Sequence, residues 1–300
     1  MTLILPNLII AGASKCGTTS LFRYLADHPQ VCAASTKETR YLIDPGYPLY
    51  QEDCNYQRGG LEGYAQFFNN YDEHKQNIIM EATPDYLYQE TPLKVLPTFE
   101  QIPTVVFMLR KPSERVYSMY QFARHNMGVL DESISFGEFL NMISSQHPWM
   151  KKRMVLLNVV EHGKYIRYLS VWREVLGAER VHILLFEDFI VETQVVMTQQ
   201  AKALGIDANF YQRYECVPKN ESVVMQNRFL HNLKQKCEVF LPKSMIGTLA
   251  GQLYQKLNTR KPVRVMSEED LELLAKLDEM YAPFNEELQR VTNLNLELWQ

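Results

Sequence analysis

The stretch LIIAGASKCGTTSLFRYL, residues 8–25, decides the fold of this chain. Its apolar first part leads into a turn that contains Gly12 and Gly17, and a helical pattern starts at Thr18. A strand, a glycine-containing turn and a helix in this order are typical of a phosphate-binding loop, in which backbone N–H groups and the helix dipole face an anion. An ordinary strand-to-helix turn with a surface lysine is the alternative interpretation.

The position of the lysine in this turn indicates which phosphate it suits. The nucleoside-triphosphatase pattern GxxxxGK[ST] has its lysine directly after the second glycine, whereas this chain has Thr18 there and Lys15 two residues before Gly17. In a triphosphatase that lysine reaches the β- and γ-phosphates, and the next hydroxyl holds Mg²⁺. The apolar run 104–110 also ends in Arg110, where such enzymes commonly have aspartate. The loop therefore predicts a nucleotide phosphate that is bound without a metal ion.

The rest of the chain alternates helical patterns with consecutive apolar runs, which indicate strands that are buried on both faces. The apolar runs are 7–13, 77–82, 104–110 and 180–188, and the helical patterns are 18–27, 112–125, 165–176, 193–204 and 268–288. Ser267 is the expected N-cap of the last helix. This order predicts one α/β domain over residues 1–300, with a central parallel sheet flanked by helices. The segment 40–75 is expected to cross the carboxyl edge of that sheet, where ligands bind.

Composition and charge exclude several classes of protein. Charged residues make up 22% of the 300 residues, and the net charge of −4 argues against a nucleic-acid or anionic-membrane surface. No apolar run is long enough to cross a bilayer, and the first predicted strand starts too close to Met1 for a signal peptide, so a cytoplasmic protein is expected. The five cysteines form no CxxC pair and the histidines form no HExxH pattern, which predicts free thiols and no metal site.

Two blocks of the sequence resemble the nucleotide-binding motifs of the PAPS-dependent sulfotransferases, whose donor is 3′-phosphoadenosine 5′-phosphosulfate (PAPS). GASKCGTTSL (12–21) resembles their 5′-phosphosulfate loop, whose usual form is close to KxGTT, and LRKPSERVYSMY (109–120) resembles their 3′-phosphate motif. Three weaker blocks follow the family's order: KETRYLID (37–44), EATPDYL (81–87) and GKYIRYLSVW (163–172). The first two of these are similar to the carbohydrate sulfotransferase branch. The resemblance covers nearly the whole chain.

The resemblance implies PAPS as co-substrate and 3′-phosphoadenosine 5′-phosphate (PAP) as product, with no metal. It implies a phosphosulfate site made by Ser14, Lys15, Cys16, Gly17, Thr18, Thr19 and Ser20. For the 3′-phosphate it implies Arg110 and Ser118, and an arginine fork suits phosphate oxygens. Tyr165, Arg260 and Lys261 complete the expected nucleotide contacts. In the family, a basic loop that contains a glycine closes over the 3′-phosphate, and this chain lacks that glycine. The alternative for Arg260 and Lys261 is therefore a run of charges that face solvent.

Sulfuryl transfer is an in-line displacement at sulfur, which needs a base for the acceptor proton and a cation on the leaving-group oxygen. The resemblance implies Glu38 as the base and Lys15 as that cation. A partly dry cleft is expected to raise the pKa of Glu38 toward a useful value. A surface glutamate paired with Lys37 is the alternative for Glu38. His125 is a second candidate base. The alternative for His125 is that its side chain caps the end of a helix.

The acceptor is the least defined part of this prediction. The carbohydrate branch often has histidine two residues beyond the catalytic glutamate, where this chain has Arg40, and lysine where it has Ala82. The candidates to line an acceptor pocket are Arg40, Tyr41, Asp85, Tyr86 and the tyrosine-rich segment 47–71. The expected acceptor is a hydroxyl or amine of a small molecule, such as a bacterial secondary metabolite or toxin, or of a glycan.

Two other functions stay open at this point. A nucleotide or metabolite kinase with the same loop architecture would use ATP and Mg²⁺, and the absent GK[ST] speaks against it. A non-catalytic nucleotide-binding protein would bind PAP without transfer, which the presence of both Lys15 and Glu38 disfavours. The pattern is compatible with a monomer and with a homodimer.

Overall fold

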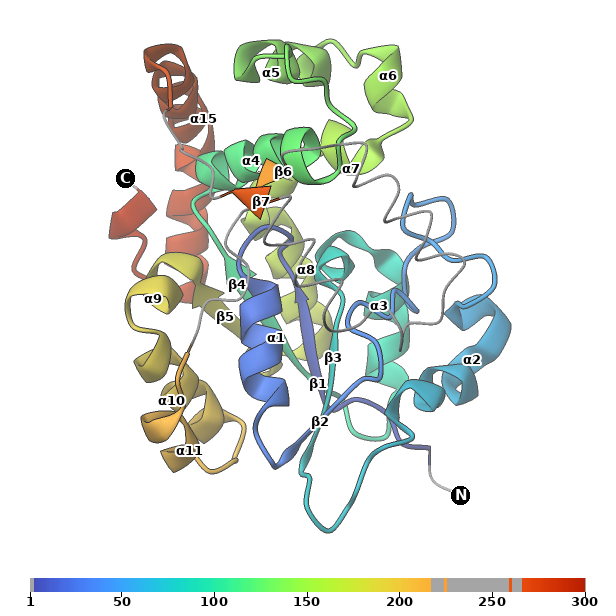
Figure 1. Ribbon diagram of the computed structural model, residues 1–300. Helices are drawn as coiled ribbons and strands as arrows, with labels where there is room; N and C mark the ends of the chain where they lie inside the picture. The colour runs from blue at the N-terminus through green and yellow to red at the C-terminus, as the bar shows by residue number, and fades with distance from the viewer. Residues whose placement is uncertain (1–2, 217–223, 226–258, 261–265, 300) are drawn as a thin grey trace.

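A sheet of five parallel strands forms the centre of the computed structural model, which describes residues 3–216, 224–225, 259–260 and 266–299 (Figure 1). The strands are β1 (Leu8–Gly12), β2 (Val31–Ala33), β3 (Ile78–Ala82), β4 (Thr104–Leu109) and β5 (Val181–Leu185). They are arranged in the order β2-β3-β1-β4-β5, and every neighbouring pair is parallel. The protein is therefore a single α/β domain around a parallel sheet, as the sequence predicts.

Helices cover both faces of this sheet, which explains why its strands are continuous apolar runs in the sequence. In Figure 1, α1 (Thr18–Ala26) lies in front of the sheet and α8 (Tyr165–Leu176) lies behind it. The other helices of this part are α2 (Tyr56–Ala65), α3 (Glu90–Val95), α9 (Phe186–Val191), α10 (Thr193–Ala203) and α11 (Asn209–Arg213). The main hydrophobic cluster joins strands and helices, with Trp172 of α8 packed edge-on against Phe107 of β4 at 5.2 Å between ring centroids.

A second hydrophobic cluster lies beyond the carboxyl edge of the sheet, at the top of Figure 1. Its elements are α4 (Pro112–Gln121), a π-helical turn (Phe122–Asn126), α5 (Phe136–Ser144), α6 (Pro148–Lys151), α7 (Met154–Leu157) and α15 (Glu268–Thr292). Ser267 caps α15 as predicted: its hydroxyl accepts the N–H of Asp270, and the Asp270 carboxylate accepts the N–H of Ser267. The second cluster thus places α4 and the π-helical turn over the ends of the strands.

The predicted elements differ from the structure mainly at their ends. The four predicted strands and the helices at α1, α4, α8, α10 and α15 are confirmed. β5 is shorter than predicted because Phe186 already begins α9, and the helix after β4 changes to π-helical geometry at Phe122. The segment 40–75 contains α2, which Asn55 caps. β2 has three residues, which are too few to give a periodic signal.

A small antiparallel pair completes the described structure. β6 (Val224–Met225) and β7 (Thr259–Arg260) pair with each other and not with the main sheet. Within the described ranges, no helix combines the length and the apolar character that a membrane span needs. The extent of the domain over all of residues 1–300 stays a prediction.

Candidate active site

A cleft of about 1060 Å³ opens where the loops after β1, β3 and β4 leave the sheet. Parallel strands present their carboxyl ends on one edge, so these loops converge although they are far apart in the sequence. Most of the predicted site residues line this cleft: Ser14, Lys15, Gly17, Thr18, Thr19, Ser20, Glu38, Arg40, Asp85, Arg110 and Ser118. The fold therefore brings the two predicted phosphate motifs and the predicted base into one site.

The loop between β1 and α1 lines one half of the cleft. The N–H of Ala13 donates to the carbonyl of Met108 at 2.8 Å, which ties the loop to β4. Lys15 and Gly17 have left-handed φ values of 69° and 86°. A Cβ added at Gly17 would also lie 2.8 Å from the ring of Phe186. Glycine is therefore required at position 17 by both backbone conformation and space.

The first turn of α1 is suited to an anion. Residues 18–20 begin the helix and line the cleft, the N-cap residue Gly17 has no side chain to cap them, and the first turn holds no acidic residue. The N–H of Ser20 donates to the carbonyl of Gly17, whereas none of the described backbone groups accepts the N–H of Thr18 or Thr19. The N–H groups at such a terminus carry the positive end of the helix dipole. Lys15 adds a full charge beside them, with its Nζ 3.7 Å from the ring centroid of Phe122.

A second cationic position lies where β4 ends. The Arg110 guanidinium donates to the carboxylate of Glu114 at 2.7 Å and lies 4.9 Å from the ring centroid of Phe186. Ser118 follows on α4 and faces the same cleft. Besides Arg40, which pairs with Glu38, the cleft thus has separate cationic points at Lys15 and Arg110, and a nucleotide with two phosphate positions requires two such points.

Tyr165 and Cys16 lie behind the wall of the cleft. Both are buried, and the Tyr165 hydroxyl donates to the carbonyl of Arg110 at 2.9 Å while it lies 3.7 Å from the Cys16 sulfur. Burial raises the pKa of the Cys16 thiol to about 11, so the thiol is neutral at physiological pH. The structure therefore places Tyr165 where it orients the end of β4, and not where it lines the cleft.

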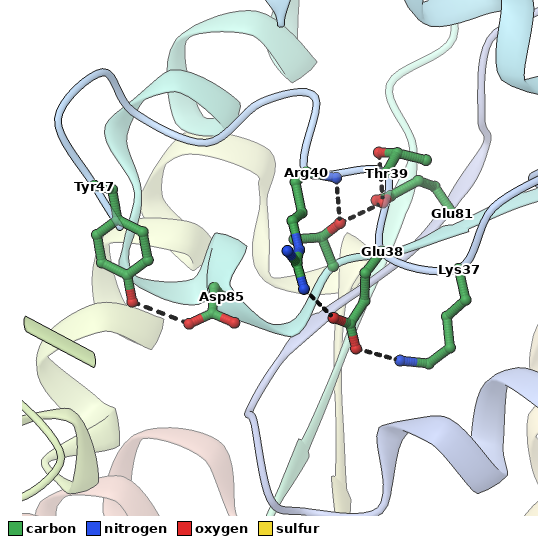
Figure 2. Close-up of polar contacts among 8 residues, drawn as sticks. Lys37, Glu38, Thr39, Arg40, Tyr47, Glu81 and Asp85 are labelled. Carbon is green, nitrogen blue, oxygen red and sulfur yellow. Dashed lines mark hydrogen bonds and ion pairs between the residues drawn. The ribbon is translucent and has the colours of Figure 1, made fainter. Parts of the chain in front are cut away.

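Glu38 is held in the cleft by the loop 37–40 (Figure 2). Its N–H donates to the carbonyl of Ala82 at 2.8 Å, and both Glu38 and Arg40 have left-handed φ values, of 62° and 56°. The loop directs two cations at the Glu38 carboxylate: Lys37 Nζ lies 2.5 Å from Oε1, and Arg40 Nη2 lies 3.3 Å from Oε2. Glu38 therefore lines the cleft, as expected of the base. It also forms the ion pair with Lys37 that the alternative interpretation predicted.

The charge state of Glu38 differs from the predicted one. Burial alone raises the pKa of Glu38, but the charge and hydrogen bond of Lys37, together with those of Arg40, more than offset this effect. The pKa of Glu38 therefore lies below its usual value, and the expectation of a raised pKa is wrong. Two cations that are close in the sequence flank the carboxylate and keep it ionised at neutral pH.

Glu81, a residue without a predicted role, supports this loop from β3. Its side chain is fully buried, and its Oε1 accepts hydrogen bonds from Thr39 at 2.9 Å and Thr83 at 2.6 Å (Figure 2). Thr83 in turn accepts the N–H of Arg40 at 3.1 Å. Burial raises the pKa of Glu81 to about 7, although the two threonines oppose the shift. A glutamate inside an otherwise apolar strand is the sequence signal for such a buried partner.

Asp85 lines the cleft beside this loop, in the turn Pro84–Tyr88 that follows β3. The residue is only 7% exposed, and its Oδ1 accepts a hydrogen bond from the Tyr47 hydroxyl at 3.0 Å (Figure 2). Burial raises the pKa of Asp85 to about 6, and the Tyr47 hydrogen bond opposes this shift. Of the four carboxylates that line the cleft, Glu38 and Glu114 pair with cations, whereas Asp85 and Glu187 have no ion pair among the described residues.

Tyr41 and Tyr86 do not line the cleft, contrary to the expectation. The Tyr41 ring stacks on that of Tyr64 with centroids 5.2 Å apart, and its hydroxyl donates to the carbonyl of Gly60 at 3.0 Å. The Tyr86 hydroxyl accepts the N–H of Leu42 at 3.1 Å. Both tyrosines are buried in the main core, where their hydroxyls satisfy backbone groups of the long segment after β2.

Three other predicted residues lie away from the described cleft or outside the description. His125 belongs to the π-helical turn and is not among the residues that line the cleft. Arg260 contributes its backbone to β7, and Lys261 lies outside the described residues, so the nucleotide contacts of both stay predictions. The described part of the chain contains no group of histidine, cysteine or carboxylate side chains that could hold a metal ion.

Comparisons with curated proteins agree with this geometry. A family model described as sulfotransferase domain matches residues 5–256. The membrane-associated sulfotransferase kil1 of Dictyostelium discoideum is 36% identical over 122 residues, which cover 40% of this chain and 24% of that protein. The bifunctional heparan sulfate N-deacetylase/N-sulfotransferase 4 of Mus musculus is 22% identical over 301 residues, which cover 96% of this chain and 32% of that protein. The chain therefore spans about a quarter to a third of the length of these relatives.

The fold is also similar to that of a solved sulfotransferase. The crystal structure of the sulfotransferase from Alicyclobacillus acidocaldarius superposes with a TM-score of 0.68 at 21% identity, and the match covers 99% of both chains. At this identity the likeness to the solved structure shows the fold alone. The family is shown by the family model, which spans most of the 300 residues. With the phosphate loop, the second basic position and the matching family model in agreement, the chain belongs to the sulfotransferase domain family.

Proposed function

We propose that the protein transfers the sulfuryl group of PAPS to a hydroxyl or amine of a small-molecule or glycan acceptor. One observation carries this proposal: a single cleft combines the phosphate loop and Lys15 with a second cationic point at Arg110 and with the Glu38 carboxylate. The kinase alternative lacks this support, because the loop has no lysine after Gly17. A cytoplasmic location and a role in tailoring a secondary metabolite belong to the same proposal.

In the proposed donor complex, the 5′-phosphosulfate binds the N–H groups of the β1–α1 loop, and Lys15 lies at the bridging oxygen. Arg110 and Ser118 bind the 3′-phosphate. The Arg110 guanidinium now pairs with Glu114, whose side chain is 45% exposed. Glu114 can therefore turn to solvent when a phosphate replaces it, and a doubly charged phosphate is the stronger partner for the arginine fork.

In the proposed reaction, the acceptor atom forms a bond to sulfur while the bond from sulfur to the 5′-phosphate oxygen of PAP breaks. Lys15 stabilises the charge that develops on that oxygen, and Glu38 takes the proton of the acceptor. Lys37 and Arg40 keep Glu38 ionised, so it is ready to accept a proton at neutral pH. Its low pKa favours a late proton transfer, because the acceptor becomes acidic only as its bond to sulfur forms.

Two measurements test this function. Calorimetry with PAP in metal-free buffer tests the donor site, and transfer of label from radiolabelled PAPS to a panel of alcohols and amines tests the reaction. We expect PAP to bind without a divalent ion and at least one class of acceptor to be labelled. Tight binding of Mg-ATP with no binding of PAP would support the kinase instead. Binding of PAP without transfer to any acceptor would support a non-catalytic protein.

A further inference from the structure

Asp85 is a carboxylate of the cleft that the donor chemistry does not use. Asp85 is 7% exposed, and its Oδ1 accepts the hydroxyl of Tyr47. Within the described residues, its Oδ2 has no hydrogen-bond donor and neither oxygen has an ion pair. The other cleft carboxylates have partners on both sides or a cation: Glu38 has two cations, Glu114 has Arg110, and each oxygen of Glu187 accepts an N–H, from Lys111 and from Trp299. Among the described residues, Asp85 is therefore the cleft carboxylate that combines the lack of an ion pair with an oxygen that has no hydrogen-bond donor.

The position of the free oxygen is informative. Figure 2 shows one oxygen of Asp85 directed to Tyr47 and the other directed away from it, on the side where Glu38 and Arg40 lie. Arg40 donates its Nη2 to Glu38, and within the described residues no hydrogen bond or ion pair joins Arg40 to Asp85. A carboxylate that is nine-tenths buried and has a single neutral donor is unfavourable, and a charged hydrogen-bond donor from a ligand would remove much of that cost.

We propose that Asp85 binds a positively charged nitrogen of the acceptor, so that the acceptor is a small molecule with an ammonium or guanidinium group besides the hydroxyl or amine that receives the sulfuryl group. This inference rests on the proposed function, since it concerns the acceptor of the same cleft. A cationic group can donate N–H bonds to the free Oδ2 and compensate the buried charge, whereas a neutral sugar hydroxyl compensates it only in part. A sulfated, polyanionic glycan would instead meet the repulsion of Asp85.

The test compares acceptors that differ only in charge. Guanidino alcohols of increasing chain length are each paired with the ureido alcohol of the same length, which has nearly the same shape and is neutral. Label transfer from radiolabelled PAPS is measured at subsaturating acceptor, with PAP calorimetry alongside it. We expect the guanidinium member of the best pair to react at least about tenfold faster, and Asp85→Asn to remove this preference while PAP affinity stays unchanged.

The pH dependence of the preference separates binding from a structural role. The charged and titratable groups that face Asp85 are Tyr47, Glu38, Arg40 and Arg115. The arginines stay charged, and Glu38 stays ionised because its pKa is lowered, so Asp85 is the group that gains a proton as pH falls through about 6. The guanidinium preference of the unsubstituted protein should therefore decline below that pH. This measurement needs no variant, so it holds even if Asp85→Asn folds poorly.

The control is Asp53→Asn, which removes the same charge from a side chain that is 98% exposed. It should keep both the preference and its pH dependence. Equal rates for guanidino and ureido alcohols throughout the panel, with PAP binding intact, would overturn the inference and leave the proposed function standing. Retention of the preference in Asp85→Asn would overturn it as well. If the protein neither binds PAP nor labels any acceptor, the proposed function is wrong and the inference falls with it.

Discussion

The two halves of the cleft present different kinds of groups to a ligand. The half formed by the β1–α1 loop and α4 presents backbone N–H groups, a helix terminus and two cations, Lys15 and Arg110. The half formed by the loop 37–40 and the turn after β3 presents side chains, with Glu38 paired to two cations and Asp85 without an ion pair among the described residues. We call them the donor half and the acceptor half, in keeping with the proposed function.

The comparison shows how a fold can keep one ligand constant while another varies. Backbone groups bind phosphate oxygens whatever the neighbouring side chains are, so the donor half needs only a few residue types at fixed spacing. In the acceptor half, recognition depends on side-chain charges, and these depend on burial and on neighbours. We therefore expect a change of one residue there to alter the acceptor without disturbing the donor. The following variants test that separation.

Glu38→Gln should have the largest effect, because it removes the proposed base from the acceptor half. We expect the transfer rate to fall by about 10²–10⁴. The affinity for PAP should stay the same, since the donor half is untouched. Steady-state transfer assays and PAP calorimetry measure the two quantities. Glu90→Gln on α3, whose side chain is 76% exposed, is the matched control. Unchanged turnover in Glu38→Gln would remove Glu38 as the base.

Lys15→Met should have a somewhat smaller effect on rate, of about 10²–10³, because it removes one group that stabilises charge on the leaving oxygen. In contrast to Glu38→Gln, it should also weaken PAP binding. Lys75→Met, at a side chain that is 76% exposed and paired with Asp72, is the control. If Lys15→Met transferred sulfate at the normal rate, the phosphate loop would have no part in the chemistry and the division into halves would fail.

The buried carboxyl under the acceptor half should make stability depend on pH. Burial raises the pKa of Glu81 to about 7, so its contribution to stability is complete below the unfolded pKa and is lost as pH rises through about 7. We expect the free energy of unfolding to fall by about 3 kcal/mol from mildly acidic to mildly alkaline pH. The raised pKa of Asp85 acts in the same direction.

Urea unfolding across this pH range measures the effect, and Glu81→Gln should flatten the pH dependence. An identical pH slope in Glu81→Gln and the unsubstituted protein would show that Glu81 is not the group that titrates.

Arg110→Ala should have the smallest effect, and it should be confined to one phosphate. We expect PAP affinity to fall about tenfold, while affinity for adenosine 5′-monophosphate, which has no 3′-phosphate, stays the same. Competition calorimetry with the two nucleotides measures the difference. Arg167→Ala on α8, where the side chain is 53% exposed, is the control. Equal losses for both nucleotides would place Arg110 elsewhere than at the 3′-phosphate.

The donor half was predictable because its signals are local. Gly12, Lys15 and Gly17 lie in one turn, and Arg110 directly ends an apolar run, so strand-to-helix order is enough to place them at one edge of the sheet. The same reasoning could not find β2, which is too short for a pattern. It also could not find the start of α9 at Phe186, because an apolar residue there suits a strand and a helix equally.

The acceptor half was predictable only in part. Glu38, Arg40 and Asp85 line the cleft, but Tyr41 and Tyr86 were expected there and are core residues. Which side chains of the loop 37–41 face the cleft depends on the left-handed backbone at Glu38 and Arg40. The residue types at these positions do not predict that backbone conformation.

The sequence by itself determined four of the five strands, the helices at α1, α4, α8, α10 and α15, the glycine-containing turn between β1 and α1, the position of Arg110 at the end of β4 and the likeness to the sulfotransferases. Only the tertiary structure decided the charge states of the carboxyl groups. Lys37 and Arg40 converge on Glu38 and lower its pKa, whereas burial leaves Glu81 and Asp85 with raised pKa values. A pKa depends on the solvent and charges within a few ångströms. For Glu81 and Asp85 the packing of distant segments sets these surroundings, and for Glu38 the left-handed backbone of the loop 37–40 sets them.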